Sequence, residues 1–273
     1  RNRLFQMIAE GDHVIKLDNL KLGFTKIVMD DFTYELEKGD DSDVWLSINN
    51  EEVEWIVSTE PLPKLMERLL DQLLGNKQVT VKMLSYLDDS ITFSMNTDIR
   101  LRVKGIQLPA VQSDTPCMTI GPILDARYLP LDSVKILNEE YIDDILIQNA
   151  RKLIVNDIGM EDVAKMKNKR IHYNDFLDYN DIPKLVVLWR DNGATIGQYF
   201  TGQIYRTKAI RDMLDEFMED SFDPEGWDGR ITEFPMSVSF KLNDEIRIKI
   251  KIAKSRINRR NFRVHVLVTK IEE

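Results

Sequence analysis

The chain has 273 residues, of which 43% are hydrophobic and 30% charged, with one cysteine and a formal net charge of −9. This length suits one large domain or two small ones, and the lone Cys117 excludes an internal disulfide and a cysteine-based metal site. The sequence contains no run of about 18 apolar residues and no signal-peptide core near its start. We therefore expect an intracellular (cytoplasmic) or virion protein with no membrane partner.

Residues 1–110 are predicted to form an N-terminal α+β region with two hairpins and one helix. The alternation over residues 44–57 predicts a hairpin with a four-residue loop at 49–52, because that loop places its two apolar sets opposite each other. Prolines at the start, a leucine stripe at helical spacing and a final glycine predict a helix over residues 61–74. A second hairpin and a further strand are expected over residues 79–103.

A proline-rich segment separates the two halves of the chain. Residues 111–131 hold three prolines, which are typical of a long connection or a domain boundary. The same segment is too apolar for a free linker, and long structureless loops are uncommon in compact domains. We expect a packed connection.

Residues 132–273 are predicted to form a C-terminal α+β region. Its best-marked helix is expected over residues 139–156, with Asn138 as its cap, because acidic residues gather near its start and basic residues near its end. This helix should bury Ile145 and Leu146 against a sheet. The other expected elements are helices over 160–169 and 208–220, and strands over 185–189 and 195–205 joined at Asp191-Asn192-Gly193.

The last part of the chain carries the clearest pattern. Three successive segments between Met236 and Val268 alternate apolar with polar residues, which predicts a three-stranded antiparallel meander with one buried face. The predicted fold class is therefore α+β, with antiparallel sheets built from consecutive hairpins, about four helices, and this meander at the end.

The polar face of the predicted meander is basic. Residues 241–270 contain ten Lys/Arg and two Asp/Glu. Stacked like charges must be spread in solvent, paired with the protein's own acidic residues between Asp212 and Glu225, or face a partner. The candidate partner-binding residues are Arg247, Lys249, Lys251, Lys254, Arg256, Arg259, Arg260, Arg263 and His265.

Recognisable catalytic patterns are missing from the sequence. His13, His172 and His265 are isolated, and no G-x-S-x-G, G-x-G-x-x-G or phosphate-loop motif occurs. The acidic group Asp175, Asp178 and Asp181 is the first candidate for a metal, but acidic residues at turns have a structural reason to be there. We expect no catalytic residue, no metal and no cofactor.

These observations favour a non-enzymatic interaction or assembly (structural) protein that docks an acidic partner through the basic sheet face. A viral or phage component is one such protein that the composition would fit. A protein partner or self-association is the main expectation. The first alternative is nucleic-acid binding through residues 241–265, which scarce aromatic residues and overall acidity disfavour. The second alternative is a metal-dependent hydrolase that uses an acidic cluster.

Overall fold

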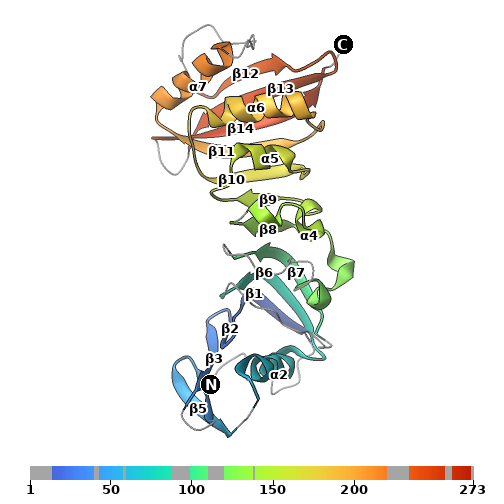
Figure 1. The fold of residues 1–273 in the computed structure, drawn as a ribbon, viewed down its shortest axis with the longest axis vertical. Coiled ribbons are helices and arrows are strands. Elements are labelled where there is room, and N and C mark those ends of the chain that lie inside the picture. Colours follow the sequence, from blue (N-terminus) through green and yellow to red (C-terminus); the bar gives the residue numbers. More distant parts are fainter. Residues whose placement is uncertain are drawn as a thin grey trace. The chain divides into compact units, whose positions relative to one another are not determined.

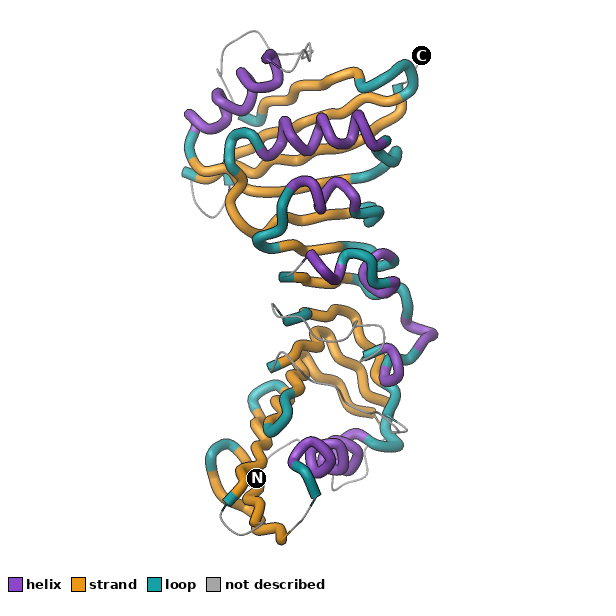
Figure 2. The backbone as a smooth tube through the Cα atoms, in the orientation of Figure 1, coloured by secondary structure: helices purple, strands orange, loops and turns teal. Residues whose placement is uncertain are grey.

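The computed structural model describes residues 14–39, 43–57, 60–87, 99–109, 120–137, 139–219, 234–255 and 260–271. The fold is mixed α/β and dominated by sheet, with five α-helices among these residues (Figures 1 and 2). The chain divides into two compact units, residues 1–150 and 151–273. The division falls after the proline-rich connection, which was expected to end at residue 131.

Unit 1 contains a mixed sheet whose strand order is β8-β7-β6-β1-β2-β3-β4-β5. Strands β8, β7, β6 and β1 pair in parallel, and β1 to β5 pair antiparallel. Its main elements are β1 (Val14–Leu22), β2 (Lys26–Met29), β3 (Phe32–Lys38), β4 (Asp43–Ile48), β5 (Glu51–Val57), α2 (Leu62–Leu74), β6 (Gln78–Tyr86), β7 (Leu101–Gln107) and β8 (Ser133–Ile136).

Helix α2 confirms the prediction over residues 61–74, with Pro61 before its first turn and five buried apolar side chains. The hairpin between β4 and β5 differs in its loop, because Asn49 and Asn50 form a two-residue turn with φ values of 54° and 67°. Asparagine tolerates this left-handed region, so the turn can be tight. A register shift after Leu46 places Trp45 opposite Trp55 and Leu46 opposite Glu54, so the apolar pairing expected from the longer loop is not formed.

The proline-rich connection is packed, as predicted, in the part that the structure describes. Short 3-10 turns cover Gly121–Ile123 and Ala126–Tyr128, and Ile120, Ile123 and Leu131 are buried. Residues 110–119, which include Cys117, lie outside the described residues, and so do residues 88–98 of the second predicted hairpin.

The helix predicted over residues 139–156 is wrong. The segment contains a 3-10 turn at Glu139–Tyr141, the short helix α4 (Ile145–Gln148) and strand β9 (Leu153–Val155). Asp144 caps α4 by accepting a hydrogen bond from the backbone N–H of Leu146 at 2.8 Å, which starts a new helix in the middle of the predicted one. Ile145 is 55% exposed, so only its neighbour Leu146 is buried as expected.

Unit 2 is built on a mixed sheet with the order β12-β13-β14-β11-β10-β9. Strands β9, β10 and β11 are parallel, and β11, β14, β13 and β12 are antiparallel. Besides β9, its elements are α5 (Met160–Lys165), β10 (Arg170–Leu177), α6 (Asp181–Asn192), β11 (Tyr199–Tyr205), α7 (Thr207–Glu219), β12 (Met236–Lys241), β13 (Ile246–Lys254) and β14 (Asn261–Lys270).

The prediction of sheets that are antiparallel throughout is therefore wrong, because both units contain parallel as well as antiparallel pairs. Parallel neighbours need a crossover, and α5 and α6 supply the two crossovers that join β9 to β10 and β10 to β11. The strand expected over residues 185–189 is helical for this reason, and Gly193 ends α6 at φ 83° instead of turning a hairpin. The final meander of β12, β13 and β14 matches its prediction.

Helices α5, α6 and α7 cover one face of the unit 2 sheet (Figure 1). The core between them and the sheet includes Trp189 of α6 and Phe217 of α7, whose ring stacks on Phe240 at a centroid distance of 4.4 Å. Gly202 of β11 belongs to this face, because an added Cβ would lie 2.3 Å from Leu177 Cδ1. The opposite face of the sheet, called the open face below, carries the strands' polar side chains.

Candidate anion-binding face

The open face follows from the period of two along the strands of unit 2. In β14 the side chains of Val264, Val266 and Val268 are buried, whereas Arg263 is exposed and His265 is partly exposed. Strand β13 has the same pattern, with three buried isoleucines between lysines that face out. Because the apolar set packs under the helices, the polar set must point to the other side.

One row of polar side chains crosses four strands of this face in register. His172 of β10 is the partner of Thr201 of β11. Thr201 faces His265 of β14, which in turn faces Lys251 of β13. Side chains at partner positions on one face are close enough to interact.

A second row lies two residues along the same strands. Arg170 of β10 is paired with Tyr199 of β11, and Tyr199 with Leu267 of β14. Leu267 is paired with Lys249 of β13. The first row ends at Lys251 and contains both histidines, whereas the second row has a cation at each end, Arg170 and Lys249.

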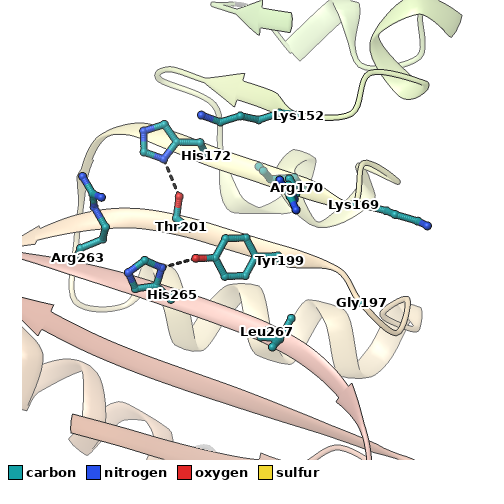
Figure 3. A pocket seen from close by; sticks show the side chains of 11 residues that line it. Lys152, Lys169, Arg170, His172, Gly197, Tyr199, Thr201, Arg263, His265 and Leu267 are labelled. Carbon is teal, nitrogen blue, oxygen red and sulfur yellow. Dashed lines mark hydrogen bonds between the residues drawn. The ribbon is translucent and has the colours of Figure 1, made fainter. Parts of the chain in front are cut away.

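The two histidines are fixed by hydroxyl partners on β11. Nδ1 of His172 and Oγ1 of Thr201 are 2.6 Å apart, and Nδ1 of His265 is hydrogen-bonded to the Tyr199 hydroxyl (Figure 3). The rings of Tyr199 and His265 also stack. A hydroxyl that donates to Nδ1 leaves the proton of a neutral imidazole on Nε2, where it can be donated to a ligand.

These side chains line two adjoining concavities of about 740 Å³ each, which share Tyr199, Arg263, His265 and Leu267. No carboxylate is among the lining residues that the structure describes. The lining includes seven cations: Lys152, Lys169, Arg170, Lys249, Lys251, Lys254 and Arg263.

The positive charge of the face is not neutralised within the described parts of unit 2. Across residues 151–219, 234–255 and 260–271, no ion pair within 4 Å joins a carboxylate to any of the seven cations. The histidines respond to this charge. Burial, then Lys152 and Arg263, lowers the pKa of His172, and burial, then Arg263 and Lys251, lowers the pKa of His265. Both rings are therefore biased towards the neutral form.

An aromatic pair lies where β10 and β11 end. Phe176 is 57% exposed and meets Tyr205 edge-to-face at a centroid distance of 6.0 Å. The guanidinium of Arg206 lies 4.9 Å from the Tyr205 ring centre, and hydrogen bonds from Arg206 and Arg260 lower the pKa of Tyr205. Tyr205 is on the same side of β11 as Tyr199 and Thr201, so this pair borders the open face.

The structure places the predicted partner-binding residues as follows. Lys249, Lys251, Lys254, Arg263 and His265 line the concavities. Arg247 is half-buried on the same side of β13 but outside the lining, and exposed Arg260 precedes β14. Arg256 and Arg259 lie outside the described residues.

Half of the face was missed by the sequence reasoning. Lys152, Arg170, His172, Tyr199 and Thr201 come from segments around β9, β10 and β11, which are far apart in the sequence and meet only through parallel pairing. The available signal was the alternation of polar His172 and apolar Ile171, and of Thr201 and Phe200. It shows which residues share a face, but not that the strands are neighbours.

The acidic helix offered as an internal mate for the basic face packs elsewhere. Helix α7 buries Ile210, Met213 and Leu214 on the helical side of the sheet. Its described acidic residues, which include Asp212 and Asp215, belong to that helical layer. The described acidic residues of α7 therefore do not pair with the open face, and that alternative is wrong for them. Residues 220–225 lie outside the described ones.

The candidate metal group is held by protein donors. Asp175 accepts hydrogen bonds from the backbone N–H of Asp157 and the amide of Asn156, and Asp181 accepts one from the backbone N–H of Asp178. Within the described ranges, no three His, Cys, Asp or Glu residues gather as ligands of a metal ion. No helix there is both long and apolar enough to cross a membrane.

Comparison with known proteins gives one match. The model of a family described as "Domain of unknown function (DUF3557)" matches residues 61–206, a range that includes β9, β10, β11 and most of unit 1. No curated protein and no solved structure matches the chain.

Proposed function

The chain belongs to the family of domain of unknown function DUF3557, whose description names no function. From the geometry of the chain itself, we propose that it is a non-enzymatic interaction or assembly protein. It docks an acidic protein partner on the open face of unit 2. The observation that carries this proposal is the set of seven cations that line one sheet face with no described carboxylate among them. A face with this field attracts negative charge and steers its approach.

The distribution of charge along the chain supports the same reading. Unit 2 contains 22 Lys/Arg and 20 Asp/Glu, whereas unit 1 contains 15 and 26. Unit 2 is therefore close to neutral in sum, yet the lining of its open face carries seven of these 22 Lys/Arg and no described carboxylate. Such segregation is typical of a surface with a charged partner.

The composition of the face favours a protein partner. Tyr205 and Arg206 border it, and the bulk of Phe176 is exposed next to them. Exposed tyrosine and arginine are the residue types that dominate binding energy at protein interfaces. Aromatic anchors beside a basic field suit a partner segment that carries both acidic and apolar side chains.

The test is charge reversal on the open face. The double substitution Lys249→Glu and Lys251→Glu should leave the melting temperature nearly unchanged, because exposed charges contribute little to stability. It should weaken binding of a fluorescent glutamate-rich peptide by at least about tenfold, because the lining then carries five cations and two carboxylates in place of seven cations.

A matched control lies on the helical side of the same unit. Lys208→Glu with Arg211→Glu makes the same change in net charge on exposed positions of α7. The control should bind the peptide as the parent does. An equal loss of peptide affinity in both double variants would show that only the net charge matters, and would contradict binding at a specific face.

Nucleic-acid binding by the same face is the second candidate. The observation that favours it is the exposed Phe176–Tyr205 pair, because bases stack on aromatic side chains beside a basic groove. A single-stranded oligonucleotide separates the two candidates. If the face binds nucleic acid, the logarithm of the binding constant for the oligonucleotide should fall steeply and linearly with the logarithm of the salt concentration. Phe176→Ala should then weaken binding of the oligonucleotide more than binding of the peptide.

A further inference from the structure

We propose that the centre of the open face is a subsite for a phosphate monoester, and that the acidic partner is therefore bound through a phosphorylated side chain. This inference rests on the function proposed above and names the chemistry of its ligand. The subsite is formed by His172, His265 and Arg263 around Thr201.

The geometry of the two histidines is the first support. They approach β11 from its two neighbouring strands, and each is held through Nδ1 by a hydroxyl of that strand. The backbones of β10 and β14 lie about 10 Å apart, because neighbouring strands are about 4.8 Å apart. Between them Thr201 is a short side chain, which leaves space above it for a ligand.

Arg263 is the second support. Figure 3 shows its guanidinium on the same side of Thr201 as both imidazoles, so that the three side chains surround one space. A guanidinium presents two parallel N–H groups that match the oxygens of a phosphate. The ammonium groups of the nearby Lys152 and Lys251 add positive charge, and as point charges they require no fixed orientation of the phosphate.

The number and kind of donors distinguish a phosphate from a carboxylate. A carboxylate has two oxygens and one charge, whereas a phosphate monoester has three terminal oxygens and a charge between −1.5 and −2, on the order of twice as much. Two imidazole Nε2–H groups and one guanidinium can each donate to a different terminal oxygen. The subsite therefore has one donor group for each terminal oxygen of a phosphate, whereas a carboxylate meets the same three donor groups with only two oxygens and about half the charge.

Binding at this subsite should respond to pH. His172 faces Thr201 of β11, Arg263 of β14 and Lys152 beside β9. His265 faces Tyr199 of β11, Arg263 of its own strand and its register partner Lys251 of β13. These surroundings favour neutral rings in the empty site. A bound dianion favours protonated rings, so its affinity should increase as the pH falls from about 7.5 to about 6.5.

The test compares three glutamate-rich peptides of one sequence that differ at a single central site. The site carries serine, phosphoserine or two glutamates that match the phosphate's charge. We expect the phosphopeptide to bind at least about tenfold more tightly than the charge-matched peptide, because only phosphate offers a separate oxygen to each of the three donor groups. His172→Asn and His265→Asn, made separately, should each reduce this preference to about twofold or less, with little change for the glutamate peptide.

The control is Lys249→Gln, which lies on the same face outside the subsite and should weaken both peptides by the same factor. If one histidine variant fails to fold, the other still decides the result. Imidazole NMR of the parent gives a second readout, in which the phosphopeptide alone should raise the pKa of His265.

The outcomes separate the subsite from the proposed function. If the glutamate peptide binds through Lys249 and Lys251 and the phosphopeptide binds no more tightly, the phosphate subsite is wrong, whereas the proposal of an acidic partner holds. Retention of the phosphate preference in both histidine variants also overturns the subsite. If no peptide binds the parent, both proposals fail. Tighter binding of a single-stranded oligonucleotide with the same histidine dependence assigns the face to nucleic acid and overturns the phosphoprotein reading.

Discussion

The side chains at the centre of the open face are held in place by other side chains and not by the backbone alone. His265 stacks on Tyr199 and shares a hydrogen bond with it, and His172 is tied to Thr201. These contacts restrict both imidazoles before any ligand arrives. A ligand then loses less entropy on binding than it would to freely rotating side chains.

The same histidines should make stability depend on pH. Their folded-state pKa values lie below the ordinary value, so the unfolded chain binds more protons in the window below that value. The stability that the two neutral histidines contribute is fully present above the unfolded-state pKa. It is lost as the pH falls from the unfolded-state pKa through the folded-state pKa. We expect the free energy of unfolding in urea to decrease from about pH 7.5 to about pH 5.5.

The double variant His172→Asn with His265→Asn separates this effect from the carboxylates, which titrate mainly at lower pH. Asparagine does not protonate, so the variant should lose less stability than the parent over the same window. An unchanged slope would show that burial at these two positions does not favour the neutral imidazole.

At the scale of elements, the sequence was most informative where the chain pairs with its own neighbours. Strands β12, β13 and β14 follow one another and alternate cleanly, so their one buried face was predicted, and Ile250 and Val266 are buried in it. Helix α2 was predicted from its stripe and its proline. In these elements, local pattern and tertiary contact demand the same structure.

Helix α6 shows why other elements were missed. Its stretch Leu185 to Trp189 is rich in β-branched and aromatic residues and precedes a strong turn signal, which together indicate a strand. The buried set Ile182, Leu185, Val186 and Trp189 nevertheless has helical spacing. The need to connect two parallel strands outweighs the propensity, and that need is not visible in the segment itself.

A pair of substitutions distinguishes the two readings of this segment. Val186 is fully buried in the helix, whereas Val187 is partly exposed. We predict that Val186→Asp lowers the free energy of unfolding by several kcal/mol, about 3–5, and that Val187→Asp lowers it by about 1 kcal/mol. In a strand, Val187 would share a face with Leu185 and Trp189. A larger loss for Val187→Asp in urea denaturation would therefore favour the strand.

At the scale of the molecule, the open face is assembled from both kinds of pairing. The meander contributes Lys249, Lys251 and Arg263, which the alternation along the chain predicted. The parallel strands contribute Arg170 and His172, whose neighbours depend on the crossover connections. The sequence therefore revealed the charge of the face but not its centre, because the centre depends on the order of strands that are distant in the chain.

The central claim is that this face, and no other described surface, meets the acidic partner. It is tested most directly by methyl NMR of labelled protein titrated with the glutamate-rich peptide. Leu267 lines both concavities, and Ile145 and Val14 are exposed methyl-bearing residues of unit 1. We predict saturable shifts of the Leu267 methyls and none of the Ile145 and Val14 methyls. Shifts of the unit 1 methyls with Leu267 unmoved would contradict the account.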